Sequence, residues 1–521
     1  MARAPRAATA AFGVLLAVAA AVYALQGRAQ WFFQDEWVFF TERDAGSVHG
    51  LFAPHNEHWV TLPVLVYRLL WDVVGARRYE PYQAMTIAAH LAVVALLHVL
   101  LRRRLGVAPW VAVAASTPLL FTSVGAENVV WAFQISFGGS LVAGLALLLL
   151  ADHPNPSRAR RAAALACGLV ALMCSGVGMV MVAVTGLALL VRRGWKPAVA
   201  TAVPLAAVYG TWLLAFGAGT NDATGDVGLI VRFVRAGMSR SLRGLGPGGG
   251  AAGLVVLVAL AGTALVAWGA RRSPEALRRR LGIPLAMASG AVAFFVLTGI
   301  TRGATQGLTF ATRGRYAYAA TVLLLPLVAV GADEVIRRSP VMTAPVLALL
   351  VAAVPANVVA IDVRANVAVP PVLVTATAAS PALDDAPADL HPFDGIAGFS
   401  SISAGWLRQQ VADGRVPTDG ATSPYWEAEA IARLTVEVGA PWSGTPACHP
   451  IAAEGEQVEL TADEPVAYVG QVSVQVVGRH GGRSHPRPAG ALEPRTIATV
   501  GDPVTVLVLP RPGVWAASLC R

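Results

Sequence analysis

Long apolar runs recur through most of the chain, and they limit its fold more than any other feature of the sequence. A transmembrane helix needs about 20 apolar residues to cross a hydrocarbon core ~30 Å thick. Eleven runs come close to this length, which predicts an α-helical polytopic membrane protein with about 11 transmembrane helices. The expected spans are residues 8–25, 81–101, 107–123, 135–151, 162–176, 178–191, 197–217, 251–270, 282–300, 316–332 and 341–360.

The composition agrees, because 55% of the residues are hydrophobic and 14% are charged, against roughly 25% charged in soluble domains. The formal net charge of +9 is unevenly distributed. Residues 1–360 contain 30 Lys and Arg against 14 Asp and Glu, whereas residues 361–521 contain 10 against 17. Short basic clusters between apolar runs are typical of cytoplasmic loops. We therefore expect a lipid bilayer as a partner and no nucleic acid.

The basic clusters predict the orientation of the chain in the membrane. Arg3 and Arg6 precede the first apolar run, which is long for a signal peptide and is interpreted as a transmembrane helix. Residues 59–74 are short and contain Pro63 and Arg68, so we interpret them as a juxtamembrane helix. This choice makes the protein a multi-pass plasma-membrane protein with a cytoplasmic N-terminus and an extracytoplasmic C-terminal domain. The clusters that it places in the cytoplasm are residues 102–104, 158–161, 192–196, 271–280 and 337–338.

The composition changes after the last expected span. Residues 361–420 are rich in Pro, Ala and Asp, which predicts a linker with one short helix from Ser401 or Ser403 to Gly414. Residues 421–521 contain short alternating runs separated by turn residues. This pattern predicts a small β-rich extracytoplasmic domain, with a sandwich as its expected form.

The four cysteines divide into two pairs. Cys448 and Cys520 lie in the β-rich domain, on the side expected to be external. Disulfides persist in oxidising compartments and are rare in the cytosol, so these two cysteines are predicted to pair. Cys167 and Cys174 lie in an apolar stretch and are interpreted as small buried side chains.

We expect a transmembrane domain at residues 1–360, and its first external loop is residues 26–80. This loop carries an unusual mixture of side chains. Its acids alternate with Trp and Phe rings, which suits a membrane–water interface where rings lie at headgroup depth and carboxylates stay hydrated. One interpretation is an interfacial loop with ordinary solvated charges, and the other is a catalytic loop held on the membrane surface. The candidate side chains in this loop are Asp35, Glu36, His55, Glu57 and His58.

Further external loops add more candidates. Residues 124–134 contain Glu127, and residues 301–315 contain three arginines against the positive-inside bias. Guanidinium groups bind phosphate in a bidentate manner, which is one interpretation of these arginines, and snorkelling at a helix end is the other. An amphipathic stretch within residues 218–250 predicts a basic surface helix on anionic headgroups. The arginines are Arg302, Arg313 and Arg315 in residues 301–315, and Arg232, Arg235, Arg240 and Arg243 in residues 218–250.

Three stretches near the N-terminus resemble the C superfamily of integral-membrane glycosyltransferases. They are QDEW at 34–37, HNEHWVTLPVLVYRLLW at 55–71 and PYQAMTIAAHLAVVALLHVLLRRR at 81–104. The layout of residues 1–360 is also similar, with a first span, an external acidic loop, a juxtamembrane helix and a second span that ends in three arginines. Several such enzymes carry an external β-rich C-terminal domain as well.

The resemblance implies a polyprenyl-phosphate-linked sugar as donor, a glycan or protein of the cell envelope as acceptor, and transfer on the outer face of the membrane. Asp35 matches the loop acid that such enzymes place against the acceptor hydroxyl, with Glu36 beside it. A carboxylate that accepts the hydroxyl proton would accelerate transfer by roughly 10²–10⁴, and external arginines would stabilise the leaving phosphate. The histidines at 55–58 and the lack of a D-x-D motif depart from the family, so a bound divalent metal is left open.

Two other functions compete with this one. A transporter or flippase would need ionisable residues inside the spans, and the expected spans contain almost none because the charges lie in the loops. A catalytically inactive relative that serves as an envelope scaffold or lipid-binding partner would keep the loop acids without transferring a sugar. The sequence therefore favours surface chemistry and leaves the scaffold as the main alternative.

Overall fold

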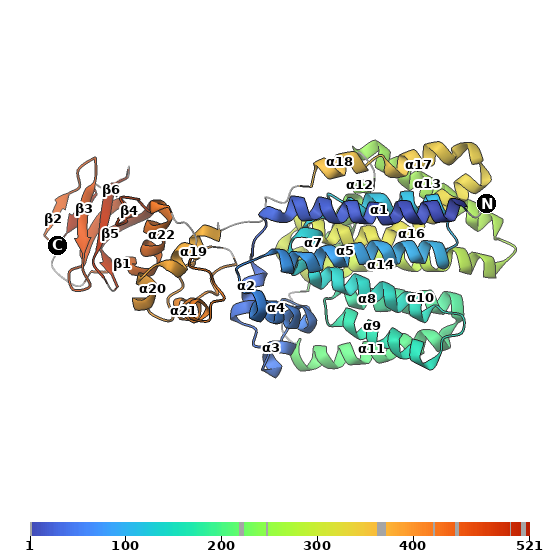
Figure 1. The fold of residues 1–521 in the computed structure, drawn as a ribbon, viewed down its shortest axis with the longest axis horizontal. Coiled ribbons are helices and arrows are strands. Elements are labelled where there is room, and N and C mark those ends of the chain that lie inside the picture. Colours follow the sequence, from blue (N-terminus) through green and yellow to red (C-terminus); the bar gives the residue numbers. More distant parts are fainter. Residues whose placement is uncertain are drawn as a thin grey trace. The chain divides into compact units, whose positions relative to one another are not determined.

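The computed structural model describes residues 3–217, 223–245, 248–361, 371–396, 398–419, 423–442, 447–500, 502–511 and 517–520. The chain forms two compact units, one helical and one that contains the β-strands (Figure 1). The external loop expected at residues 26–80 is divided between them. The first unit contains Met1–Gln30, Asp44–Tyr67 and Glu80–Ala365, and the second contains Trp31–Arg43, Arg68–Tyr79 and Asn366–Arg521.

The first unit is a bundle of helices, most of which run along one common direction (Figure 1). Eight helical segments among the described residues are long and apolar enough to cross a membrane, which confirms a helical membrane protein with several spans. They contain α1 (Arg3–Gln26), α5 (Glu80–Arg103), α8 (Ile135–Ala151), α11 (Trp195–Phe216), α13 (Gly248–Gly269), α14 (Pro274–Gln306), α16 (Gly314–Arg338), and α17 (Thr343–Val351) together with α18 (Val354–Val359).

The other three expected spans are also helical but shorter. α6 (Pro109–Leu120), α9 (Arg158–Leu172) and α10 (Val177–Arg193) contain 12, 15 and 17 residues. The total of eleven spans therefore stays a prediction. The remaining short helices that matter for the candidate site are α3 (Val48–Phe52), α4 (Thr61–Val74), α7 (Ala126–Val130), α12 (Val227–Arg243) and α15 (Leu308–Ala311).

The chain leaves α1 and enters α5 at the same end of the helical unit. The side-chain amide of Gln83, in the first turn of α5, donates hydrogen bonds to the carbonyls of Gly27 at 3.0 Å and Val130 at 2.9 Å. The residues between α1 and α5 therefore begin and end at the same end of the helical unit and do not cross it. α4 has 14 residues, which is short for a span, so this geometry favours a juxtamembrane helix at residues 59–74.

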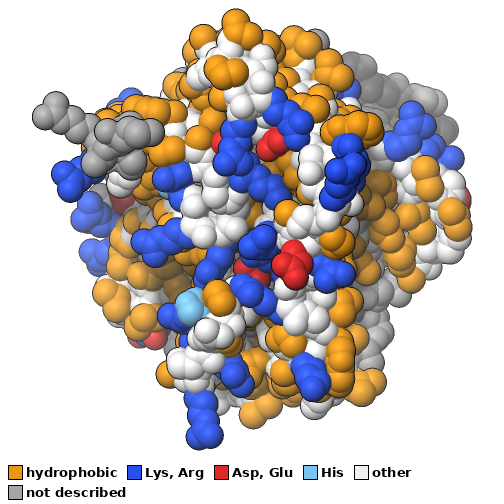
Figure 2. All heavy atoms as spheres, turned by 90° about the vertical axis from the view of Figure 1, so that its right-hand side faces the viewer, with side chains coloured by type: hydrophobic (Ala, Val, Ile, Leu, Met, Phe, Trp, Pro, Cys, Tyr) orange, Lys and Arg blue, Asp and Glu red, His pale blue; other side chains and the backbone are white. Residues whose placement is uncertain are grey.

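The opposite end of the helical unit is strongly basic. Figure 2 shows this end, with many Lys and Arg side chains and few acids among them. Arg280 bonds to the carbonyl of Leu105 and to Asp333, and Asp333 also accepts from the backbone N–H of Ala108 at 2.8 Å. These contacts join the end of α5 and the start of α6 to α14 and α16. Positive charge gathered at one end of a bundle is the pattern of a cytoplasmic face.

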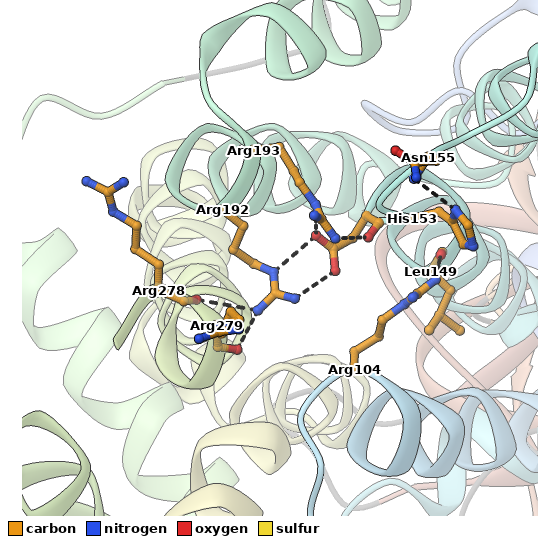
Figure 3. Close-up of polar contacts among 9 residues, drawn as sticks. Arg104, Leu149, His153, Asn155, Arg192, Arg193, Arg278 and Arg279 are labelled. Carbon is orange, nitrogen blue, oxygen red and sulfur yellow. Dashed lines mark hydrogen bonds and ion pairs between the residues drawn. The ribbon is translucent and has the colours of Figure 1, made fainter. Parts of the chain in front are cut away.

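Asp152 is the centre of a second ionic cluster at this end. Figure 3 labels the arginines of this cluster, Arg192 and Arg193, with Arg104 nearby. Its side chain is fully buried, and Arg192 donates to both of its carboxylate oxygens at 3.0 Å. Arg193 donates to the same carboxylate at 3.2 Å and to the Asp152 carbonyl at 2.7 Å. Arg104 bonds to the carbonyl of Leu149 at 2.8 Å. One aspartate at the end of α8 thus ties this helix to the end of α10, beside Arg104, which directly follows α5.

The strands of the second unit form one antiparallel sheet, which confirms a small β-rich domain. The long strand β4 pairs with three others and so joins them into a single sheet, in place of the two separate sheets of the expected sandwich. Hydrogen-bonded neighbours follow the order β1 (Val436–Pro441), β5 (Arg487–Thr499), β4 (Val466–Val477), β6 (Val504–Pro510) and β3 (Glu456–Leu460), and β7 (Ser518–Cys520) pairs with both β4 and β2 (Cys448–Pro450).

Two local predictions for this unit are confirmed. Cys448 and Cys520 form a disulfide between the paired strands β2 and β7. The expected short helix is α21 (Ala404–Ala412), whose first turn is capped by the Ser403 hydroxyl, which accepts from the backbone N–H of Trp406 at 3.2 Å. Three other helices of this part are α19 (Pro371–Ala379), α20 (Ala382–Asp385) and α22 (Pro424–Thr435).

An aromatic cluster holds the N-terminal segments of the second unit against α21. The ring of Trp71 stacks on Phe40 at 4.1 Å and on Trp406 at 5.7 Å, measured between ring centroids. Its indole N–H donates to the side chain of Gln410 at 2.9 Å. The backbone N–H of Ala76 donates to the carbonyl of Arg415 at 2.8 Å. Residues 31–43 and 68–79 therefore share a core with the C-terminal part of the chain.

Candidate functional site

Asp35 is the first residue of α2 (Asp35–Thr41) in the second unit, and it is partly exposed. The residue before it, Gln34, has φ 46° and ψ −117°. Non-glycine residues rarely adopt a positive φ, and such positions cost of order 1–3 kcal/mol and cluster at functional sites. Gly398 packs so closely on this residue that a Cβ there would lie 2.3 Å from the Gln34 Cα atom. The fold therefore holds Asp35 on a constrained turn.

Glu36 lies on the same turn but is fully buried. One carboxylate oxygen accepts from the backbone N–H of Phe33 at 2.8 Å, and the other accepts from the Tyr79 hydroxyl at 3.1 Å. Both oxygens are thus used inside the fold. This geometry suits a residue that fixes the position of the Asp35 turn.

The other sequence candidates lie in the first unit. The stretch HNEH forms a tight turn in which His55 and His58 exchange two backbone hydrogen bonds of 3.0 Å, with Asn56 at φ 51°. Trp59 fixes the turn to α11, because its ring stacks on Trp212 with 5.3 Å between centroids. His55 is buried, and its ring lies 5.4 Å from that of Phe133.

Glu57 points from this turn to the end of α14. Its carboxylate forms a 2.5 Å ion pair with Arg302, which also donates to the Tyr316 hydroxyl at 3.1 Å. The ring of His58 lies 4.0 Å from the same carboxylate. α14 starts at the basic end of the bundle and α16 returns to it, so these residues lie at the opposite end.

Three arginines surround the ring of Phe310 in α15. The guanidinium carbons of Arg302, Arg313 and Arg315 lie 5.5, 5.6 and 5.4 Å from the ring centroid. Cations are attracted to aromatic faces at such distances. Glu127 in α7 accepts from Arg315 at 3.4 Å. The group therefore has three guanidinium groups against two carboxylates, and we name these three arginines with Phe310 the arginine cluster.

Two titratable groups beside the cluster have shifted pKa values. Burial alone would raise the pKa of Glu57, but the hydrogen bond from Arg302 and the nearby positive charges outweigh it and lower that pKa. Burial lowers the pKa of His58 to about 4, and the adjacent carboxylate of Glu57 opposes this only in part. At neutral pH, Glu57 is therefore a carboxylate and His58 is a neutral imidazole.

An apolar groove begins beside the Glu57–Arg302 pair. Its first part is a cavity of about 170 Å³ that includes Glu57, His58, Arg302 and Tyr316 in its wall. The second part, of about 260 Å³, runs between α10 and α14 toward the basic end. Both parts share Met179, Val180 and Leu297 and are lined mainly by apolar side chains, so they form one continuous groove.

Within the described part of the chain, no group of three or more His, Cys, Asp and Glu side chains is arranged to hold a metal ion. Glu57 of the HNEH turn is paired with Arg302 instead. The fold brings together Glu57, His58, Glu127, Arg302, Arg313 and Arg315 in the first unit, and it places Asp35 and Glu36 in the second. Phe310, Tyr316 and the groove were missed from the sequence, because apolar and aromatic residues in or next to spans give no local signal of a site.

Comparison with protein-family models found no match, and comparison with curated proteins found none either. The class that the fold defines is thus a multi-pass helical membrane protein with a small β-rich C-terminal part.

Proposed function

We propose that the protein is a glycosyltransferase that moves a sugar from a polyprenyl-phosphate donor to a glycan or protein acceptor of the cell envelope, on the outer face of the plasma membrane. The observation that carries the proposal is the arginine cluster beside the α10–α14 groove. A phosphate on a long isoprenoid chain needs both a cationic site at the interface and an apolar path into the bilayer. Guanidinium groups would bind the phosphate and stabilise it as it leaves.

Asp35 is proposed as the general base, on the resemblance of its loop to the catalytic loop of membrane glycosyltransferases and on its partial exposure. Glu57 and Glu127 are each paired with an arginine. The bond from Arg302 lowers the pKa of Glu57, which makes Glu57 a weak proton acceptor. Glu36 is buried with both oxygens hydrogen-bonded. Asp35 is partly exposed on a constrained turn, where it can take the proton of an acceptor hydroxyl. A non-catalytic, lipid-binding scaffold is the alternative, and it would use the same arginines and groove.

The experiment that tests the proposal is transfer from a polyprenyl-phosphate sugar by the purified full-length protein, with single substitutions in the arginine cluster. Arg313→Lys and Arg315→Lys keep the charge but lose the planar fork that binds phosphate through two hydrogen bonds. Each is expected to weaken donor use about 10-fold or more, as lost charge-assisted bonds do. Arg337→Lys, on the exposed basic end, is the matched control and should leave transfer unchanged. Unchanged transfer in both cluster variants would reduce these arginines to interfacial anchors.

The orientation, with eleven spans and an external C-terminal domain, is testable by labelling. Residue 155 lies in the connection between α8 and α9, and residue 275 lies in the first turn of α14, both at the basic end. Single cysteines at these two residues should resist a membrane-impermeant thiol reagent in intact cells. A cysteine at residue 420, a position outside the described residues, should react, because the C-terminal unit would lie outside. Labelling in the opposite pattern would turn the arginine cluster to the cytoplasm and remove the basis for transfer on the outer face.

A further inference from the structure

A second basic pocket lies on α12, outside the groove that contains Glu57 and Arg302. It has a volume of about 460 Å³ and is lined by Ala236, Ser239, Arg240 and Arg243 of α12 and by Thr312. Thr312 precedes Arg313 of the arginine cluster, but no residue of that cluster lines the pocket. The proposed transfer reaction gives this pocket no role.

The packing of α12 explains why its arginines face outward. Phe233, Gly237 and Ser241 are buried on one side of the helix, and a Cβ atom on Gly237 would lie 2.1 Å from the ring of Phe295 in α14. The opposite side carries the four arginines predicted from the sequence, and all of them are exposed. This close contact fixes the rotation of α12, so its arginine side cannot turn toward the bundle.

The pocket lies near the level of the arginine cluster. α12 packs antiparallel to the last turns of α14, with Phe233 against Gly299 and Gly237 against Phe295. The neighbouring Phe294 lies 5.7 Å from Tyr316 at the start of α16, between ring centroids. This packing places the N-terminal half of α12 toward the end of the bundle that is opposite to the basic end. The residue after α12, Gly244, reaches the same end, because a Cβ atom on it would lie 3.2 Å from Val124 and a Cβ atom on Gly314, at the start of α16, would lie 2.5 Å from the Val124 carbonyl oxygen.

The two arginines of the pocket give it a positive charge. Among the residues that the structure describes, neither Arg240 nor Arg243 has a carboxylate partner. Residues three apart on a helix are neighbours, and like charges at this spacing repel. A bound anion removes that repulsion, and Ser239 offers a hydroxyl beside it. The Thr312 hydroxyl is already used, because it donates to the carbonyl of Thr309 at 2.8 Å.

We propose that this pocket binds the phosphate of an anionic glycerophospholipid, as a lipid site separate from the donor site. Two guanidinium groups and a hydroxyl match a phosphodiester in charge and in hydrogen-bond donors. Leu308 of α15 is an exposed apolar side chain four residues before Thr312, and it favours a lipid over a free phosphate ion. The site needs only the membrane-embedded fold and no transferase activity.

The test measures lipids retained by the full-length protein in nanodiscs that contain equal amounts of phosphatidylglycerol and phosphatidylcholine, read by native mass spectrometry. Wild-type protein should retain phosphatidylglycerol preferentially. The double variant Arg240→Gln/Arg243→Gln should lose this preference by about 10-fold or more, because it loses the charge-assisted bonds. The matched control is Arg232→Gln/Arg235→Gln, which removes the same charge at the same spacing on the same helix but outside the pocket. It should keep the preference within about 2-fold.

Three results would overturn the proposal. Equal loss in both double variants would mean a diffuse attraction by the basic helix and no pocket. The absence of any lipid preference in the wild-type protein would mean no anionic lipid site. Removal of bound phosphatidylglycerol by millimolar inorganic phosphate would assign the pocket to a free anion. If the glutamine variant fails to fold, Arg240→Lys/Arg243→Lys keeps the charge without the fork and should show a smaller loss of preference.

Discussion

Asp35→Asn is expected to reduce sugar transfer by roughly 10²–10⁴, the range that general-base catalysis supplies. The amide keeps the size of the side chain but cannot accept the proton of an acceptor hydroxyl. Folding should be unaffected, because Asp35 is partly exposed and the constrained turn is held by Gly398 and by the buried carboxylate of Glu36. The measurement is transfer from a polyprenyl-phosphate sugar, with thermal unfolding recorded for the same preparation.

The other carboxylates of the candidate site provide the controls for Asp35. Glu57→Gln and Glu127→Gln each remove the charge that faces an arginine of the cluster, so they should affect donor binding more than the rate with saturating donor. Glu36→Gln should lower stability together with activity, because it changes a buried, fully bonded carboxylate. Full activity in Asp35→Asn with strong loss in Glu57→Gln or Glu127→Gln would move the base to that residue. Full activity in all four variants would favour the non-catalytic scaffold.

The predictions that succeeded depend on local sequence. Apolar runs such as that of α5 predict spans, because a segment in lipid must form its backbone hydrogen bonds internally, as an α-helix does. The basic ends of the helices could be recognised because charge between spans is itself a local pattern. The cap at Ser403 and the pairing of Cys448 with Cys520 also follow from residue type and position.

The division of the first external loop could not be predicted, because it depends on contacts between distant parts of the chain. Trp71 meets Trp406 and Gln410 across more than 300 residues, and the aromatic pattern of residues 31–59 gives no sign of this partner. Those rings suggested a membrane–water interface, yet Trp37 and Phe40 are fully buried in the core of the second unit. A ring that packs on protein and a ring that lies among headgroups look alike in a sequence.

The sequence predicted which charged residues belong to the candidate site, but not which acid pairs with which arginine. Residues 301–315 suggested a phosphate site through their external arginines, and the three residues do gather around one ring. The partner of each acid depends on how α7, α14 and the HNEH turn pack. The groove forms where the surfaces of α10 and α14 meet, so the sequence of either helix alone does not reveal it.

Asp152→Ala is expected to destabilise the helical unit more than any loop substitution. The side chain is buried and forms the only carboxylate contact of Arg192 and Arg193 among the described residues. Its removal leaves two guanidinium groups facing each other near Arg104, with no counter-charge. Breaking a buried pair in this way costs about 3–5 kcal/mol, because the remaining charge stays desolvated. Partial exposure of Arg193 places the expected loss at the lower end of that range.

The loss is measured as the free energy of unfolding of the full-length protein in detergent, followed by tryptophan fluorescence. Glu334→Ala is the matched control, since it breaks an ion pair at the same end of the bundle with an arginine, Arg338, that is well exposed. Pairs of this kind contribute about 0–1 kcal/mol. Asp152→Asn separates the effect of charge from that of shape. The amide oxygen can still accept a hydrogen bond from Arg192, but the side chain no longer neutralises the charge of its guanidinium group. An Asp152→Ala variant as stable as Glu334→Ala would mean that helix packing alone holds α8 against α10, and that the aspartate only offsets the positive charge at the basic end of the bundle.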